Sequence, residues 1–217
     1  MRWIDVETWE RKRHYDLFRD YLNPYFTICA DLDVTAFLSA CGSRGTPFFA
    51  TFLHFVMQSL NSLPEFRTRI RADGVVLHDV VHPSYTVMTE EGLFRFVTTP
   101  WDPDPAVFIP RVKADIEASK KTVDLSDAEG VDDLVYVSSL KWISFTMVSH
   151  PYDNRRPDSF PRITWGKYEE REGKMRIPVS VMAHHALCDG EHAALFYRRL
   201  QEALDNWSRG GFHGSQE

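Results

Sequence analysis

Several features that define whole classes of protein are scarce in this sequence. Only three of its 217 residues are cysteines, Cys29, Cys41 and Cys188, and their spacing fits neither a disulfide framework nor a paired metal site. Lys and Arg total 25 against 31 Asp and Glu, and the resulting net charge of −6 argues against a nucleic-acid partner. The first residues lack the apolar core of a signal peptide. We therefore expect a cytoplasmic protein that does not bind nucleic acid.

Long hydrophobic runs are missing as well. The longest stretch without a formal charge, 46–64, approaches the length of a membrane span, but His54, Gln58 and Asn61 interrupt it. We interpret it as a buried helix and expect no membrane partner. No repeat or linker divides the chain, and its 43% hydrophobic content is enough for one core. We expect a single domain over residues 1–207 and a disordered tail over 208–217.

Helical and extended patterns alternate along the chain. The apolar spacing predicts helices over 8–21, from Asp33 onward, over 46–64 with Thr46 as the cap, and over 112–121. Four prolines between Pro100 and Pro110 exclude a regular helix in that segment. β-branched and aromatic residues predict strands over 25–33, 75–78, 85–88, 94–98, 134–148 and 163–168.

The clearest unit is the last one. Alternate residues from Ile177 to Ala183 are apolar, and His185 falls on the same face of the predicted strand, with His184 on the other face. After Gly190, apolar residues recur every three or four positions as far as Trp207, which is the pattern of an amphipathic helix. A strand, a histidine-rich turn and a helix therefore follow in order.

The turn in this unit places two imidazoles, a thiol and a carboxylate within seven residues, from His184 to Gly190. Three interpretations are open from these residues alone. The first is zinc binding, although no second ligand pair accompanies the candidate ligands His184, His185, Cys188, Asp189 and His192. The second is a Cys188 nucleophile with a histidine base, although a Cys so placed is more often a small packed residue.

The third interpretation is that one histidine is a general base and Asp189 has a structural role. An imidazole with the usual pKa near 6.5 is largely neutral at cellular pH and can take a hydroxyl proton. Asp189 followed by Gly190 is also an ordinary helix N-cap, which stabilises a helix by about 1 kcal/mol without any catalysis. The pattern His-x-x-x-Asp-Gly is too short to decide among the three.

Seven segments of the chain, in order, resemble the chloramphenicol acetyltransferase family, of the type A trimeric kind. They are Trp9-Glu-Arg-Lys-Arg-His-Tyr, Asp33-Val-Thr-Ala-Phe-Leu, Pro64-Glu-Phe-Arg, His82-Pro-Ser-Tyr-Thr-Val, Trp142-Ile-Ser-Phe, Gly166-Lys-Tyr and His184-His-Ala-Leu-Cys-Asp-Gly. The resemblance covers nearly the whole length. The same final turn marks the acyltransferase core of 2-oxo acid dehydrogenase complexes, but the lipoyl and linker segments of those proteins do not accompany it here.

The resemblance implies the CoA-dependent acyltransferase fold, an α/β two-layer sandwich of a mixed β-sheet with helices. It further implies a homotrimer with each active site between subunits, acetyl-CoA as co-substrate, no permanently bound cofactor and no metal. The implied function is that of a chloramphenicol O-acetyltransferase, in which the acceptor hydroxyl attacks the thioester directly. Two alternatives stay open: an acyltransferase acting on a different small alcohol or amine, and a catalytically silent trimeric ligand binder.

The residues of the family's reaction centre carry over by position. His185 would be the general base, with one ring nitrogen held by its own backbone carbonyl. Ser138 would donate a hydrogen bond to the oxyanion of the tetrahedral intermediate, and Thr164 would help to hold an ordered water near that oxyanion. Asp189 would pair with Arg11 and so support the site.

Other positions correspond to substrate contacts. Phe18, Phe94 and Phe145 would line the acceptor pocket, and Lys167 would bind the coenzyme. The sequence departs from the family at Glu191, where Phe is usual, at Phe18, where some members have Tyr, and at Pro47, where a member can offer Lys to the coenzyme phosphate. The segment 146–151, Thr-Met-Val-Ser-His-Pro, also shares little with the family. The reaction type is therefore predicted more firmly than the acceptor.

Overall fold

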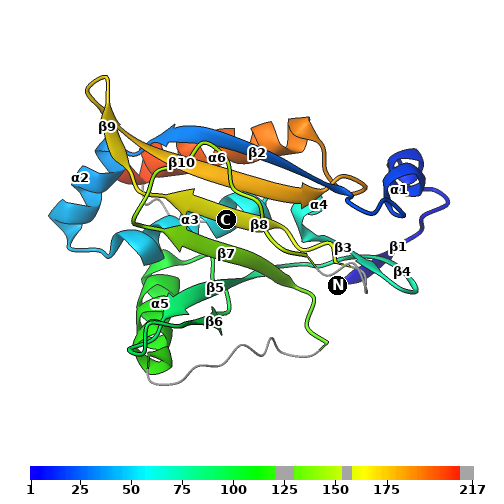
Figure 1. Cartoon of the computed structure of the whole chain (residues 1–217), viewed down its shortest axis with the longest axis horizontal. Coiled ribbons are helices and arrows are strands. Elements are labelled where there is room, and N and C mark those ends of the chain that lie inside the picture. The colour runs from blue at the N-terminus through cyan, green and yellow to red at the C-terminus, as the bar shows by residue number, and fades with distance from the viewer. Residues whose placement is uncertain (121–129, 153–157, 211–217) are drawn as a thin grey trace.

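The computed structural model describes residues 1–120, 130–152 and 158–210, in which helices and strands alternate (Figure 1). The strands are β1 (Arg2–Ile4), β2 (Tyr25–Asp33), β3 (Thr68–Arg71), β4 (Gly74–Leu77), β5 (His82–Met88), β6 (Phe94–Thr98), β7 (Leu134–Leu140), β8 (Arg162–Gly166), β9 (Glu169–Arg171) and β10 (Lys174–His184). The helices are α1 (Lys12–Phe18), α2 (Thr35–Arg44), α3 (Phe48–Asn61), α4 (Pro64–Arg67), α5 (Pro105–Ser119) and α6 (Gly190–Ser208).

The main sheet has the strand order β2-β10-β8-β7-β5-β6, and β9 pairs with β10 at one end. β7 is parallel to both β5 and β8, whereas β10 is antiparallel to β2 and β8, and β5 to β6. The sheet is therefore mixed, as the resemblance implied. Helices α2, α3 and α6 lie behind it in Figure 1, so the architecture is a two-layer α/β sandwich.

The alternation of side chains along the central strands explains why the helices cover one face of this sheet. Val179 and Val181 of β10, Ile163 of β8 and Val137 of β7 point to the helices and are buried in the main core. The residues between them point to the opposite face, which we call the open face. Core side chains from the helices are Phe37, Phe52, Val56, Leu60, Phe196, Leu200, Leu204 and Trp207.

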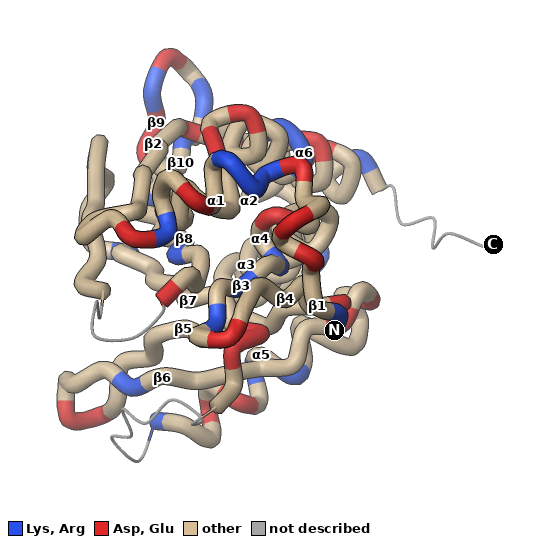
Figure 2. Tube along the Cα trace, turned by 90° about the vertical axis from the view of Figure 1, so that its right-hand side faces the viewer, with Lys and Arg blue, Asp and Glu red and all other residues tan. Residues whose placement is uncertain are grey.

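Helix α3 confirms that the uncharged stretch 46–64 is a buried helix. Ten of its residues are buried, among them His54. The helix begins after Pro47, whose extended backbone takes the N-cap position that the sequence assigned to Thr46. In the described part of the chain, no helix is long and apolar enough to cross a membrane. Seen from the side, Lys and Arg are interspersed with Asp and Glu along the trace (Figure 2).

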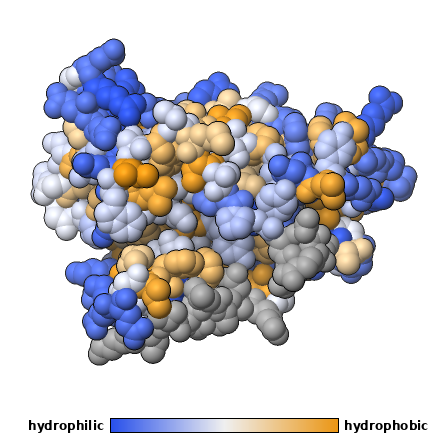
Figure 3. Space-filling view, viewed as in Figure 1, coloured by the Kyte–Doolittle hydropathy of each residue, from blue (hydrophilic) through white to orange (hydrophobic). Residues whose placement is uncertain are grey.

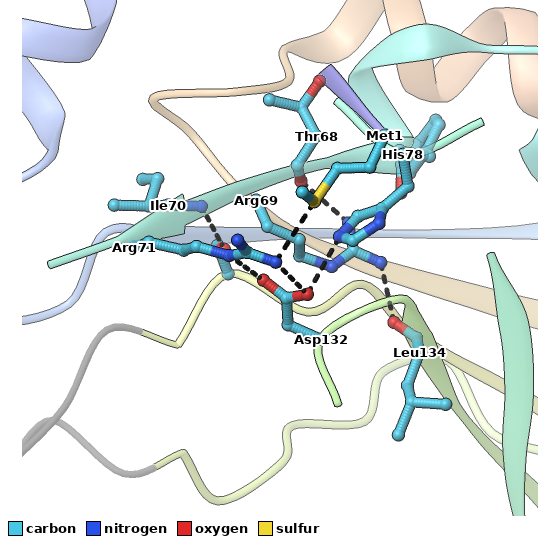
Figure 4. A network of polar contacts seen from close by, with 10 residues as sticks. Met1, Thr68, Arg69, Ile70, Arg71, His78, Asp132 and Leu134 are labelled. Carbon is cyan, nitrogen blue, oxygen red and sulfur yellow. Dashed lines mark hydrogen bonds and ion pairs between the residues drawn. The ribbon is translucent and has the colours of Figure 1, made fainter. Parts of the chain in front are cut away.

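A second, three-stranded antiparallel sheet of order β1-β4-β3 carries the N-terminus. A fully buried arginine joins it to the main sheet (Figure 4). The Arg69 guanidinium donates to the backbone carbonyls of Phe66 at 2.9 Å, Thr68 at 2.7 Å and Leu134, the first residue of β7, at 2.7 Å. Burial lowers the pKa of Arg69 to about 10, which still leaves it charged at neutral pH.

Asp132 provides a second link between the two sheets. Arg71 of β3 donates to both of its carboxylate oxygens, at 2.6 and 2.8 Å (Figure 4). The His78 Nε2 atom lies 3.0 Å from Asp132, although the imidazole is not aligned for a hydrogen bond. Because Asp132 lies two residues before β7, these contacts fix where that strand enters the sheet.

Two predictions of secondary structure are wrong. Helix α5 begins at Pro105 and includes Pro110, in a segment from which the prolines were expected to exclude a helix. Pro105 occupies the first turn, where a missing N–H is harmless, and the Asp104 side chain caps the helix by accepting from the Ala106 N–H at 2.8 Å. Pro110 loses one helical hydrogen bond, but burial of Phe108 and Val112 on either side favours the helix over the break.

The second error concerns the end of β7, which stops at Leu140 rather than continuing to Val148. Leu140 pairs with Gly166, the last residue of β8, so there is no partner strand beyond it. The chain turns there, and Ile143 accepts a hydrogen bond from the Lys167 N–H at 2.8 Å. Residues 141–152 then cross the open face of the sheet, and we call them the crossing segment.

The two ends of the chain differ from the expected bounds by a few residues. Helix α1 spans Lys12–Phe18 and is shorter than the predicted 8–21. Helix α6 includes Ser208, the first residue of the segment 208–217 that the sequence assigned to a disordered tail. Residues 211–217 of that tail lie outside the described residues.

The crossing segment packs closely against Gly166 of β8, and this contact generates the first prediction. A Cβ at this position would lie 2.8 Å from the Pro178 ring and 2.9 Å from the Ile143 carbonyl oxygen. Gly166→Ala should lower the free energy of unfolding by about 1–3 kcal/mol, because the contact is with backbone that must move. Urea denaturation followed by circular dichroism measures the loss.

Gly42→Ala is the matched control. Gly42 lies inside α2 and is exposed, and an added Cβ would meet no atom within 4 Å. Alanine there should raise stability by roughly 0.5–1 kcal/mol through helix propensity. Equal effects of the two substitutions would contradict the close approach at Gly166.

Candidate active site

His185 lies just beyond the end of β10, in a tight turn that leads into α6. The Leu187 and Cys188 N–H groups both donate to the His184 carbonyl at 3.0 Å, which closes the turn. The His185 N–H donates to the Pro24 carbonyl at 2.7 Å, so the turn is also tied to the residue that precedes β2. The backbone therefore determines where the imidazole lies before any side-chain contact is considered.

The His185 ring is held between two phenylalanines and one carbonyl. Phe18 of α1 is stacked on it at 4.2 Å between ring centroids with an interplanar angle of 13°, and Phe26 of β2 lies at 4.9 Å. The Nδ1 atom is 3.0 Å from the Cys188 carbonyl oxygen. A carbonyl can only accept, so in the neutral ring Nδ1 carries the hydrogen and Nε2 keeps its lone pair.

The partner of Nδ1 differs from the expectation. The family resemblance implied the backbone carbonyl of His185 itself, whereas the structure uses the carbonyl of Cys188. The reason is the turn, which brings the Cys188 carbonyl back beside the ring. The chemical consequence is the same, because either carbonyl leaves Nε2 as the proton acceptor.

Asp189 is fixed by two interactions at once. It is the N-cap of α6, and its side chain accepts from the Glu191 N–H at 3.1 Å. Its other carboxylate oxygen accepts from Arg11 at 2.9 Å, so the expected pair is present. Desolvation raises the pKa of Asp189, but the hydrogen bond from Arg11 and the nearby His192 outweigh it and hold the pKa below the usual value. Asp189 thereby joins the turn to the segment that precedes α1.

The other polar side chains of the turn have different surroundings. Cys188 is buried among core residues, and desolvation raises the pKa of its thiol, which disfavours the nucleophilic thiolate. His184 points to the open face, where burial lowers its pKa to about 4, and its Nδ1 accepts from the Ala186 N–H at 3.2 Å. Among the described residues, no group of three or more His, Cys, Asp or Glu side chains is arranged to hold a metal ion.

Ser138 and Thr164 are neighbours on the open face of the sheet. Ser138 of β7 pairs with Thr164 of β8, which in turn pairs with Ser180 of β10. The residues beside them along each strand are in the helix-facing core, so all three hydroxyls point to the open face. The Thr164 Oγ1 atom is 2.8 Å from Nε2 of His150, a residue of the crossing segment.

Three further predicted site residues lie at the same end of the sheet as Ser138. Phe145 belongs to the crossing segment and lies against Gly166. Lys167 follows Gly166 and is exposed. Phe94 is the first residue of β6 and is 46% exposed. It lies on the edge strand of the sheet, beyond β7 and β5 from Phe145 and Lys167. Glu191, one of the departures from the family, is exposed in the first turn of α6.

The predicted residues therefore form two groups within one chain. The histidine half-site comprises His185, Asp189, Arg11 and Phe18, and the serine half-site comprises Ser138, Thr164, Phe145, Phe94 and Lys167. Ser180 is level with Ser138 across two strand spacings, and His185 is five residues farther along the chain, just past the end of β10. Strand geometry then separates the Cα atoms of His185 and Ser138 by roughly 19 Å. A single copy of the chain does not bring the two side chains together.

Two residues near these half-sites were missed in the sequence. Phe26 belongs to the predicted strand 25–33, and its position beside the His185 ring emerges only from the pairing of β2 with β10. His150 was noticed only as part of a segment that differs from the family. No spacing rule places it on Thr164, because the crossing segment has no regular periodicity.

Comparisons with known proteins bear on the family and the fold of the chain. Residues 1–201 match the protein-family model described as chloramphenicol acetyltransferase. Similar proteins include chloramphenicol acetyltransferases of Escherichia coli, 28% identical over 208 residues and 95% of each chain, and of Klebsiella sp, 29% identical over 210 residues and 95% of each chain. The protein named chloramphenicol acetyltransferase 3 of Escherichia coli is 29% identical over 94% of this chain and 96% of its own.

Solved structures give the same result for the fold. A structure titled chloramphenicol acetyltransferase superposes with a TM-score of 0.88 at 30% identity, covering 94% of this chain and 99% of the other. A probable dihydrolipoamide acetyltransferase from Listeria monocytogenes superposes with a TM-score of 0.67 at 15% identity over 92% of both chains, which shows a shared fold. The predicted CoA-dependent acyltransferase fold is confirmed.

The Arg11–Asp189 pair generates a prediction about stability and pH. Asp189 has a depressed pKa in the folded protein, so the stability that it contributes is present above its unfolded-state pKa, near 3.9. That contribution is lost as the pH falls through the lower folded-state value. Asp189→Asn should therefore have a lower melting temperature than the wild type at neutral pH, and the two temperatures should converge below about pH 4. Calorimetry at a series of pH values measures this.

Asp20→Asn is the control, because it removes a carboxylate that pairs with Arg19 and is 81% exposed. Its effect on stability should be within about 0.5 kcal/mol of zero. A difference between wild type and Asp189→Asn that stays constant from pH 7 to pH 3 would contradict a charge-based role.

Proposed function

The chain belongs to the chloramphenicol acetyltransferase family, and on that premise we propose that it transfers an acetyl group from acetyl-CoA to a hydroxyl of chloramphenicol. The observation that carries this proposal is the hydrogen-bond arrangement of His185, whose Nδ1 is held by the Cys188 carbonyl. An imidazole fixed in this way presents the unshared pair of Nε2 to an acceptor hydroxyl. Simple ligand binding requires no such group.

In the proposed reaction, the acceptor oxygen attacks the thioester carbonyl while its proton passes to Nε2 of His185. The resulting tetrahedral oxyanion accepts a hydrogen bond from the Ser138 hydroxyl. When the intermediate collapses, the carbon–sulfur bond breaks and the thiolate of CoA takes the proton back from the imidazolium. The products are the acetyl ester and free CoA, and the chain needs no permanently bound cofactor for this step.

The two groups supply catalysis of the size that such a transfer requires. A positioned general base contributes about 10²–10⁴-fold, and one oxyanion donor is worth roughly 3 kcal/mol. Acetyl-CoA is already an activated thioester, so holding both substrates between base and donor supplies the remainder. Asp189 and Arg11 contribute indirectly by fixing the turn that holds His185.

The separation of the half-sites leads us to propose a homotrimer with three shared sites. Since His185 and Ser138 are roughly 19 Å apart in one chain, the serine half-site of one subunit must face the histidine half-site of the next. Figure 3 shows hydrophobic groups open to solvent on the sheet side of the molecule. Leu17 and Leu22 are 54% and 85% exposed next to the histidine half-site, and Met147 is 72% exposed on the crossing segment.

The coenzyme would lie at the end of the sheet where Lys167 is exposed. Its backbone is bonded to Ile143, so it is close to Lys141 and Trp142, a cation–π pair at 5.5 Å whose indole is 59% exposed. Two lysines and an exposed indole suit the phosphates and the adenine of CoA. The three cysteines are free, which fits a reducing cytoplasm.

A second acceptor class, another small alcohol or an amine, is favoured by one observation. His150 places a polar imidazole on Thr164, in a segment that differs from the family. Phe18, which has no hydroxyl, also uses one ring face to stack on His185. The acceptor surface therefore differs in polarity from the one that the resemblance implies, whereas the base and the oxyanion donor are unchanged.

Measurement of free thiol release from acetyl-CoA tests the proposed function. The wild type should turn over with chloramphenicol, and a panel of other alcohols and amines ranks the acceptors. His185→Ala should lower kcat by about 10³-fold or more while the melting temperature stays within a few degrees, because the base is lost and the fold is not. Ordinary turnover in this variant would refute the assignment of the base, and silence with every acceptor would favour the ligand binder.

Mixed trimers test whether the site is shared. Ser138→Ala and His185→Ala should each be nearly inactive alone, but co-refolding equal amounts should restore about a quarter of wild-type activity, since one site in four then combines an intact His185 with an intact Ser138. The control replaces Ser138→Ala by the Ser138→Ala/His185→Ala double variant, which should restore nothing. Failure of the first mixture to recover, with trimers verified by light scattering, would place both groups in one subunit.

A further inference from the structure

His150 makes a contact that the acyl-transfer scheme does not yet use. Its Nε2 atom is 2.8 Å from the Thr164 hydroxyl oxygen. Thr164 has no exposed surface, so its hydroxyl depends on a nearby partner for hydrogen bonding. The imidazole reaches it from the crossing segment, above the open face of the sheet.

Ser138, Thr164 and Ser180 form a row of three hydroxyls, which we call the hydroxyl row, and Thr164 is at its centre. Ser138, the proposed oxyanion donor, is its register partner on β7, one strand spacing or about 5 Å away. Ser180, its register partner on β10, is also buried. Any group that sets the direction of the Thr164 O–H bond therefore acts within one strand spacing of the proposed oxyanion donor.

The direction of this hydrogen bond has a chemical consequence. If Nε2 donates, the Thr164 hydrogen is free to point elsewhere, and a water beside Thr164 can lie in several orientations. If Nε2 accepts, the Thr164 hydrogen is used, and the hydroxyl oxygen is then only an acceptor toward its other neighbours. A water bound there must give one hydrogen to Thr164, which leaves its second hydrogen for the oxyanion.

We propose that His150 is a positioning residue whose Nε2 accepts the Thr164 hydroxyl hydrogen and so orients a water between Thr164 and the oxyanion. The inference rests on the proposed acetyl transfer. It adds to that reaction a second histidine on the side of the oxyanion, which orients a hydroxyl through a hydrogen bond and does not take up the acceptor proton as His185 does.

The surroundings of His150 favour a neutral ring that can accept. Burial lowers its pKa, and the positive charge of Arg162 lowers it further. The crossing segment is held close by, where the Tyr152 ring lies 4.9 Å from the Tyr25 ring and its hydroxyl donates to the Leu22 carbonyl at 3.4 Å. The ring therefore has a fixed approach to Thr164.

A double-mutant cycle tests whether His150 acts through Thr164. His150→Leu should lower kcat about tenfold with little change in KM for acetyl-CoA or the acceptor, and His150→Gln, which keeps an acceptor oxygen, should recover most of kcat. In a Thr164→Val background, which has no hydroxyl to orient, His150→Leu should cause no further loss. Ser149→Ala, at an exposed residue next to His150 in the same segment, should leave kcat unchanged.

Additive losses in the cycle, or a change confined to the KM of the acceptor, would overturn the proposal, because His150 would then act on the substrate or on the fold. A wild type that is silent with every acceptor would contradict the acetyl transfer itself, which separates the two failures.

A measurement that needs no turnover decides the direction of the bond. Nitrogen-15 NMR of histidine-labelled wild type, with the His150 signals assigned by their loss in His150→Gln, distinguishes a hydrogen on Nδ1 from one on Nε2. The proposal requires the Nδ1–H form. An Nε2–H form at neutral pH would refute it, and so would an Nδ1–H form that is equally populated in Thr164→Val.

Discussion

The turn that follows β10 is the constraint on which the site depends. Its backbone bonds to Pro24 and His184 place His185 beyond the end of the strand, and the Cys188 carbonyl then fixes which ring nitrogen carries the hydrogen. No ionised partner is required for this, because a carbonyl dipole selects the tautomer without the charge of a carboxylate. Asp189 is used for a different purpose, as a cap of α6 and a partner of Arg11. Removal of the turn would leave the imidazole without orientation even if every neighbouring side chain were kept.

The register of the main sheet imposes the second constraint. Pairing sets Ser138, Thr164 and Ser180 side by side, while β10 continues for four more residues before His185 is reached. Side-chain flexibility cannot close a gap of roughly 19 Å. In the proposed reaction, a chain with this sheet would therefore transfer the acyl group only where a second copy supplies the missing half. The exposed hydrophobic residues beside both half-sites are the physical counterpart of that need, since large apolar side chains open to solvent are typical of contact surfaces.

The sequence predicted those helices and strands in which the spacing of apolar residues follows directly from one buried face. β10 alternates because one face meets the helices and the other the open face, and α6 and α3 were recognised from their apolar positions. The prolines of α5 led to a wrong prediction, because the free energy lost with one helical hydrogen bond at Pro110 is smaller than the free energy gained by burying Phe108 and Val112.

The crossing segment could not be predicted, since it is held by single contacts at Gly166, Thr164 and Leu22 rather than by a repeat. The same reason hides the His150 contact and the Cys188 carbonyl that holds Nδ1. The family resemblance predicted the residues of both half-sites, but only the strand pairing shows that the two half-sites are far apart within one chain.

Burial gives the three imidazoles near the proposed reaction different tasks. His184 is adjacent in sequence to His185, yet it faces the open side of the sheet, where desolvation lowers its pKa to about 4 and its Nδ1 accepts from the turn. It is therefore neutral and does not compete for the acceptor proton. His150 is also kept neutral, by burial and by Arg162. A cation in either position would repel the imidazolium that forms on His185 during transfer, and in the low dielectric of the interior that repulsion would be larger than in water. Neutral neighbours thus leave the developing positive charge to His185 and the developing negative charge to the hydroxyl row, which keeps the two opposite charges on the two sides of the reacting carbonyl.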